Sequence, residues 1–242
     1  MENLEFRTKK DLDKYLSRFP VIGNGTEGVC YLLDGKWVLK KFKTFRNRYL
    51  DGIYLQFKKV RIDKVSFARY SVYVDGFLGG VISPYIKGAN ILYFSLANEE
   101  IIKAAWAAQN LVLTIRDVSD NGIWLDDIWE KNLIYHNKRL GIIDTTKCRH
   151  CVDDKGLEKD NLIMTMQAVI SSVFMDRSDD RCITKFMDES DSWYKDYDQD
   201  IYLLQNPKEL LLGVKAELEE YLQMPIERFS DVAEPLKRIL EK

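Results

Sequence analysis

The chain has 242 residues, of which 46% are hydrophobic and 31% charged, and its formal net charge is −2. This composition excludes a disordered or collagen-like chain, and four cysteines are too few for a disulfide framework. The longest uncharged stretch, residues 161–175, is shorter than the roughly 18–20 residues that a membrane span needs. The first ten residues also lack the apolar core of a signal peptide. We therefore expect a cytoplasmic protein with reduced thiols and no membrane contact.

The charges are unevenly distributed along the chain. Residues 1–83 carry 16 Lys and Arg against 9 Asp and Glu, whereas residues 84–242 carry 20 against 29. This change of sign predicts two structural units. The acidic second part argues against general nucleic-acid binding.

The first third of the chain has mostly strand-like patterns. Two dipeptides, Asp34-Gly35 and Asp75-Gly76, are typical of tight hairpin turns. Apolar spacing predicts two helices in this part, an amphipathic one over residues 8–19 and a basic one over residues 45–59. The predicted strands are 20–22, 29–33, 37–42, 66–74 and 77–86.

Helical patterns dominate from Asn98, which we interpret as the N-cap of a helix that reaches about Ile115. A short hairpin around Asn137 interrupts them, and further helices are predicted over 160–175, 207–223 and 229–241. Strands followed by helices predict an α+β fold, with a β-rich unit over 1–84 and a helical unit over 85–242.

A glycine-rich segment lies between two of the predicted strands. Gly23, Gly25 and Gly28 have the spacing GxGxxG, which lets backbone amides approach phosphate closely. The pattern alone is weak. It is followed here by strand, turn and strand rather than by a helix, which is the context of a kinase-type nucleotide loop. Lys40 lies in the last of these strands, where its side chain could reach phosphates, while Lys41 points to the opposite face.

A second motif covers residues 124–144. Asp127 and Asn132 lie five residues apart in a loop that leads into a strand, and Asp144 follows an apolar strand twelve residues later. Phosphoryl transfer needs groups that orient a hydroxyl and that hold magnesium against phosphates. Asn132 and Asp144 supply the oxygen ligands that magnesium prefers, which leaves Asp127 for the acceptor hydroxyl.

In this order the motifs resemble the protein-kinase-like superfamily, in a small, divergent, bacterial type, from Gly23 to the helix at 160–175. The resemblance implies a two-lobed fold with a shortened activation segment, which binds ATP and Mg²⁺ between the lobes. Asp127 and Lys40 are then the catalytic residues, with Asp127 at the acceptor hydroxyl, and Asn132 and Asp144 hold the metal. Asp160 resembles the acid that anchors the central helix of the large lobe. Residues implied to contact ATP are Gly23, Gly25, Gly28, Cys30, Lys40, Pro84 and Ile86.

The chain also departs from the family pattern. No glutamate lies between Lys41 and Asn98, so the helix carboxylate that would pair with Lys40 is missing, and Asp51 is the candidate substitute. Leu125 and Asp126 replace the histidine and arginine before the catalytic aspartate. Only sixteen residues separate Asp144 from Asp160, which leaves little platform for a peptide substrate.

The expected function is transfer of the γ-phosphoryl group of ATP to a hydroxyl of a protein or a small molecule. The alternative is a pseudokinase, a nucleotide-binding interaction module without turnover. The basic stretch 41–69 is either a solvated helix face or a docking site for an acidic or phosphate-bearing partner. Cys148 and Cys151 are interpreted as ordinary free thiols, with a zinc site or a redox pair as less favoured alternatives.

Overall fold

The computed structural model describes residues 2–151, 156–174, 182–189, 192–194, 196–197 and 200–240. The chain forms two compact units. The first unit comprises residues 1–86 together with 143–147, and the second comprises residues 87–142 and 148–242. The short return of 143–147 to the first unit has no counterpart in the sequence-based division at residue 84.

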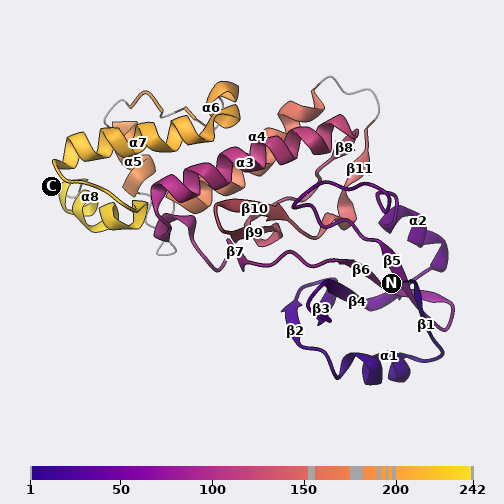
Figure 1. Ribbon diagram of the computed structural model, residues 1–242. Coiled ribbons are helices and arrows are strands. Elements are labelled where there is room, and N and C mark those ends of the chain that lie inside the picture. Colours follow the sequence, from indigo (N-terminus) through magenta and orange to yellow (C-terminus); the bar gives the residue numbers. More distant parts are fainter. Residues whose placement is uncertain are drawn as a thin grey trace. The chain divides into compact units, whose positions relative to one another are not determined.

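The first unit contains a six-stranded mixed sheet with the order β1-β5-β6-β4-β3-β2 (Figure 1). Only β1 runs parallel to its neighbour, β5, and all other pairs are antiparallel. The strands are β1 (Leu4–Phe6), β2 (Val21–Asn24), β3 (Gly28–Leu33), β4 (Trp37–Arg46), β5 (Tyr70–Val74) and β6 (Phe77–Pro84).

The predicted turns of this sheet are present because their residues adopt the backbone that each turn needs. Asp75 and Gly76 have φ angles of 50° and 75° and join β5 to β6 as a two-residue loop. Asp34 and Gly35 have φ angles of 49° and 67° between β3 and β4. Positive φ at both central residues gives the turn the twist of the flanking strands.

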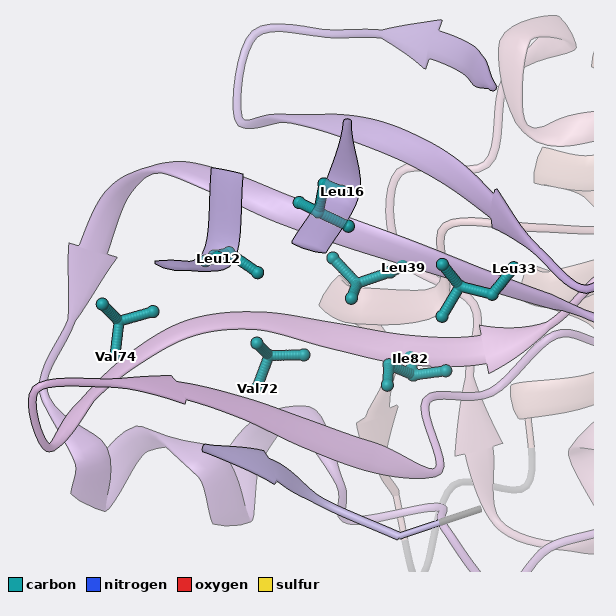
Figure 2. Packing of buried hydrophobic residues seen from close by; sticks show 7 residues of the cluster. All are labelled: Leu12, Leu16, Leu33, Leu39, Val72, Val74 and Ile82. Atoms are coloured by element: carbon teal, nitrogen blue, oxygen red, sulfur yellow. The ribbon is translucent and has the colours of Figure 1, made fainter. Parts of the chain in front are cut away.

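Helix α1 (Lys9–Leu16) covers one face of the sheet. Thr8 caps it, since the Thr8 hydroxyl accepts from the Asp11 amide and the Asp11 carboxylate accepts from the Thr8 amide, a capping box. Leu12 and Leu16 are spaced by one helical turn and are fully buried. Figure 2 shows them beside the sheet residues of the same core cluster, which are Leu33, Leu39, Val72, Val74 and Ile82.

The opposite face of the sheet has its own core around Phe42, Tyr73, Leu78 and Val81. It is covered by the chain between β4 and β5, which contributes Leu55 and Ala68. A long basic helix over 45–59 was predicted there, and that prediction is wrong. Strand β4 continues to Arg46, where it pairs with Leu78 of β6, and only the single turns η1 (Arg48–Leu50) and α2 (Asp51–Tyr54) follow.

The second unit is mainly helical. Helix α3 (Ile101–Asp120) packs against α4 (Leu157–Phe174) and α7 (Pro207–Leu222), and Figure 1 shows these helices side by side. Helix α3 begins three residues after the predicted N-cap, because Asn98 closes the short η2 turn (Leu96–Asn98). The remaining helical elements are α5 (Cys182–Glu189), α6 (Ile201–Gln205), η5 (Phe229–Val232) and α8 (Ala233–Leu240).

Short strands complete the second unit. Strands β9 (Leu133–His136) and β10 (Arg139–Ile142) form the predicted hairpin around Asn137, and β7 (Ala89–Asn90) pairs with β9. Strands β8 (Ile123–Trp124) and β11 (Arg149–His150) form a second, two-stranded sheet. A mixed sheet in the N-terminal part and helices in the C-terminal part confirm the predicted α+β class. No helix in the described ranges is long and apolar enough to cross a membrane.

Candidate functional site

The predicted site residues fall into two sets, one in each unit. The first unit contains the glycine loop, Lys40 and Asp144, and the second unit contains Asp127 and Asn132. Each set is described by itself below.

The glycine loop joins β2 to β3 as a tight hairpin end. The Gly25 amide donates to the Gly28 carbonyl at 2.9 Å, and the Lys43 amide of β4 donates to the Glu27 carbonyl at 2.9 Å. A Cβ on Gly28 would lie 2.4 Å from the Lys41 carbonyl oxygen, so only glycine fits this close approach of β3 to β4. The loop is therefore tied to the strand that carries Lys40.

Lys40 lies in the middle of β4 with only 13% of its side chain exposed. Its Nζ donates to both carboxylate oxygens of Asp144, at 2.7 and 2.9 Å, and to Oε2 of Glu27 at 3.0 Å. The lysine and the aspartate are 104 residues apart in the sequence. The first unit therefore brings together the predicted phosphate-binding lysine and the predicted metal-binding aspartate.

Electrostatics favour the charged form of each partner. Burial opposes the ammonium of Lys40, but the charges and hydrogen bonds of Asp144 and Glu27 outweigh it and raise the Lys40 pKa above its ordinary value. Burial likewise opposes the Glu27 carboxylate, yet the hydrogen bond and charge of Lys40 hold the Glu27 pKa below its ordinary value. Lys40 and Glu27 therefore each favour the charged form of the other.

Glu27 was not predicted as a site residue, although it lies inside the GxGxxG motif. Its Oε1 also lies 3.5 Å from Arg46 Nη2, so the carboxylate is placed between two cations of β4. The signal that could have identified it is its position directly before Gly28, where the loop turns back toward β4. The GxGxxG pattern specifies only its glycines and leaves the residues between them open.

The expected pairing of Asp51 with Lys40 is corrected by these contacts. Asp51 is the first residue of the single turn α2, and its carboxylate accepts a hydrogen bond from the Tyr73 hydroxyl of β5. This contact, together with burial, raises the Tyr73 pKa. Asp51 therefore holds α2 against the sheet, and Lys40 takes its carboxylate partners from elsewhere.

Asp144 follows β10 and adopts a left-handed backbone, with φ of 55°. Thr146 Oγ1 donates to Asp144 Oδ1 at 2.9 Å. Thr145, which is buried, donates from its Oγ1 to the Ser66 carbonyl at 2.9 Å. The turn η4 (Thr145–Lys147) is thereby fixed within the first unit, and 39% of the Asp144 side chain remains exposed. An exposed carboxylate suits a hard cation.

The remaining residues implied to contact ATP also lie in the first unit. Cys30 is partly buried in β3, in register with Lys40 of β4, and burial raises the pKa of its thiol to about 11. Pro84 ends β6, and its carbonyl accepts from Ser66 Oγ at 2.6 Å. Ile86 follows and is partly exposed, and Gly23 pairs with Cys30.

In the second unit, the loop after β8 carries the predicted catalytic aspartate. Asp127 has φ of 62°, and its Oδ1 accepts from Trp129 Nε1 at 2.8 Å. Asn132 is 5% exposed at the end of η3 (Glu130–Asn132), and its Nδ2 donates to the Asp127 carbonyl at 2.6 Å. This bond uses the amide nitrogen of Asn132, so the amide oxygen is its candidate ligand atom. The second unit thus brings Asp127 and Asn132 together, as predicted from their spacing.

Asp126, the neighbour of Asp127, has a different environment. Its carboxylate forms an ion pair with Arg149 of β11, with 2.9 Å between Oδ2 and Nη2. Arg149 also lies over the Trp124 ring. Asp126 therefore links the loop to β11.

Asp160 was expected to anchor a central helix, whereas the hydrogen bonds from α4 to this loop come from the next residue. Asp160 is exposed, whereas Asn161 is fully buried in α4. Asn161 Oδ1 accepts from the Leu125 amide at 2.8 Å, and its Nδ2 donates to the Ile123 carbonyl at 2.8 Å and to Ser119 Oγ at 2.9 Å. The inward face of α4 carries residue 161 and not residue 160. A carboxylate at the buried position would be costly, whereas a neutral amide can be buried with its hydrogen bonds made.

Two further predicted features are the cysteine pair, Cys148 and Cys151, and the basic stretch 41–69. The described residues contain no group of three or more His, Cys, Asp and Glu side chains that could hold a metal ion. Cys148 is buried and Cys151 is partly buried. Several cations of the basic stretch 41–69 have partners within the first unit, which are Asp13 for Lys41, Glu27 for Arg46, Glu5 for Arg48, and backbone carbonyls for Arg61 and Arg69.

Comparison with known proteins adds no family assignment. No protein-family model and no curated protein matches the chain.

Proposed function

We propose that this protein is an ATP- and magnesium-dependent phosphotransferase of atypical kinase type, which transfers the γ-phosphoryl group to a hydroxyl of a protein or a small molecule. The observation that carries the proposal is the pair of Lys40 and Asp144. A partly buried lysine beside a glycine hairpin and an exposed aspartate are held within 2.9 Å of each other from distant parts of the sequence. Nucleotide-dependent phosphoryl transfer needs both groups in one place.

The residues of the first unit fit a metal-bound nucleotide in charge and chemistry. Lys40 supplies a fixed positive charge, and such a charge stabilises the negative charge that develops on transferring phosphoryl oxygens. Asp144 supplies a single exposed carboxylate, and magnesium usually takes one or two carboxylates with phosphate and water as its other ligands. The metal, when bound, would neutralise phosphate charge.

The residues of the second unit fit the acceptor side of the reaction. Asp127 can accept the proton of an attacking hydroxyl, and its left-handed backbone is a costly conformation of a kind that gathers at functional sites. The Trp129 indole holds the Asp127 carboxylate in one orientation. Asn132 holds the Asp127 backbone through its amide nitrogen, and its amide oxygen is of the kind that magnesium prefers.

A second candidate function is nucleotide binding without turnover, as in a pseudokinase. The observation that favours it is the crowding of Lys40 by two carboxylates, Glu27 and Asp144, which repel a phosphate. The altered residues Leu125 and Asp126 before the catalytic aspartate support the same alternative.

Turnover of γ-labelled ATP, measured beside the nucleotide-induced shift in melting temperature with and without Mg²⁺, tests the proposal. We expect a magnesium-dependent shift and slow ATP turnover. Asp144→Asn should abolish the magnesium dependence of the shift, and asparagine tolerates the left-handed backbone at this position. Glu5→Gln, which removes an exposed ion pair with Arg48, is the matched control. A magnesium-dependent shift without turnover would select the binding module, and no shift at all would reject both functions.

A further inference from the structure

Lys40 of β4 has a second carboxylate partner, which lies in the glycine loop. Glu27 belongs to the loop between β2 and β3, one residue before Gly28, and its Oε2 lies 3.0 Å from Lys40 Nζ. Its other oxygen, Oε1, lies 3.5 Å from Arg46 Nη2. One carboxylate therefore bridges two cations that are six residues apart on β4.

The position of Glu27 is fixed by its backbone as well as by its charge. The Glu27 carbonyl accepts from the Lys43 amide at 2.9 Å, which joins the loop to β4 between the two cations. On the other side, Gly28 lies so close to β4 that a Cβ would lie 2.4 Å from the Lys41 carbonyl oxygen. A side chain held at the backbone and at both carboxylate oxygens loses little further freedom when it positions a neighbour.

We propose that Glu27 is the positioning residue for Lys40 in the phosphotransferase reaction, in place of a carboxylate from a helix. This inference rests on the proposed function. The segment between β4 and β5 contains no glutamate, and its candidate aspartate, Asp51, is bonded to Tyr73. Both Asp144 oxygens contact Lys40, and Asp144 would also be the residue that holds a metal. Glu27 would then keep the ammonium in place through its own contact.

A carboxylate from a helix would position Lys40 independently of the glycine loop that binds phosphate. Glu27 lies in the same loop whose glycine amides would approach the phosphates. Displacement of this loop away from β4 would therefore remove the partner of Lys40 and the phosphate-binding amides together. The orientation of the Lys40 side chain would therefore depend on whether the glycine loop lies against β4.

The opposite interpretation is that Glu27 imitates a phosphate and blocks the site. In that case removal of its charge frees Lys40 and Arg46 for nucleotide, and ATP binds more tightly. The two interpretations predict effects of opposite sign for Glu27→Gln, which keeps the size of the side chain and removes its charge.

The first measurement needs no nucleotide. The Lys40 pKa is followed by NMR of labelled lysine side chains, assigned with Lys40→Arg. Glu27→Gln should lower this pKa, because one of two anions beside the ammonium is lost. Asp51→Asn and the control Glu5→Gln should leave it unchanged. A pKa that moves with Asp51→Asn and not with Glu27→Gln would overturn the assignment of the partner.

The second measurement is steady-state ATP turnover. Glu27→Gln should lower kcat by about ten- to a hundredfold with a smaller change in KM, since a misplacement of about 1 Å can cost about 10²-fold. Glu27→Asp should retain more activity than Glu27→Gln. The melting temperature of each variant should stay within about 4 °C of wild type, as expected for a partly exposed ion pair.

The outcomes separate this inference from the proposed function. If the wild-type protein turns over ATP and Glu27→Gln is unchanged or faster, the positioning role is wrong and the phosphotransferase proposal stands. If Asp144→Asn retains the magnesium-dependent shift, the proposed site itself is wrong. If wild type neither binds nor turns over ATP, both fail, whatever the Lys40 pKa shows about the pair.

Discussion

Substitution of Asn161 by alanine should destabilise the protein more than any other single polar-to-alanine change in α4. Asn161 has no exposed surface, and its amide bonds two buried backbone groups, the Leu125 amide and the Ile123 carbonyl. The third partner, Ser119 Oγ, also donates to a helix carbonyl and keeps that bond without Asn161. Two backbone groups therefore lose their partners.

The magnitude follows from the cost of each orphaned group. A buried donor or acceptor without a partner costs about 1–3 kcal/mol, so Asn161→Ala should cost about 2–6 kcal/mol. The lower half of this range is expected if water enters the space that alanine leaves. The urea m-value increases with chain size, and with a value of about 3 kcal/mol per M the unfolding midpoint should fall by about 0.7–2 M.

Two further variants make the measurement specific. Asp160→Asn changes the exposed neighbour and should alter the free energy of unfolding by less than about 0.5 kcal/mol. Asn161→Asp keeps the acceptor for Leu125 but places a second oxygen against the Ile123 carbonyl. Burial raises the pKa of the introduced carboxyl above its unfolded value of about 3.9, so the variant should lose stability as pH rises through the folded pKa.

Urea unfolding followed by circular dichroism tests the reasoning. A midpoint for Asn161→Ala equal to that for Asp160→Asn would refute it, because the loop before Asp127 would then not depend on the Asn161 amide. A loss for Asn161→Asp that did not vary with pH would show that the carboxyl is not held against the Ile123 carbonyl.

The remaining predictions concern the loop, the thiol and the acceptor side. Gly28→Ala should lower both the melting temperature and ATP affinity, because its Cβ would lie 2.4 Å from a β4 carbonyl oxygen, whereas Gly52→Ala, with no atom within 4 Å, should change neither. Equal effects of the two variants would refute the close approach. Cys30 should react with iodoacetamide half-maximally near pH 11, measured on its own peptide by mass spectrometry, because burial disfavours its thiolate. Reaction at the rate of an exposed thiol at pH 8 would contradict this. Asp127→Asn should lower ATP turnover by about 10²–10⁴-fold with nearly unchanged nucleotide affinity, while Asp126→Asn should affect turnover less. The reverse order would move the catalytic role to Asp126.

Local chemistry in the sequence determined the turns and the long helices. Asp75-Gly76 and Asn137 form the predicted tight hairpins because these residues accept positive φ. The helices over 157–174 and 207–222 lie close to their predicted bounds, since a long segment with helical apolar spacing buries one side only when it is helical. The spacing of Asp127 and Asn132 also placed both in one loop, where a hydrogen bond joins them.

Only tertiary contacts decided the segment after Lys40. The helical spacing of Tyr49, Ile53 and Phe57 predicted a helix, yet Tyr49 is 90% exposed and Ile53 57% exposed. Pairing with β6 extends β4 to Arg46 and leaves room for single turns alone. A short segment with helical spacing adopts another conformation when hydrogen bonds to neighbouring strands stabilise it.

The partners of Lys40 were likewise beyond reach of the sequence. Asp51 was expected from its place in a predicted helix, and that helix does not form. Glu27 reaches Lys40 because the glycine hairpin turns back onto β4, and Asp144 reaches it because residues 143–147 return to the first unit. Residue spacing specifies which groups are near along the chain. Which carboxylate meets a buried ammonium is decided by strand pairing and by the cost of leaving that charge alone.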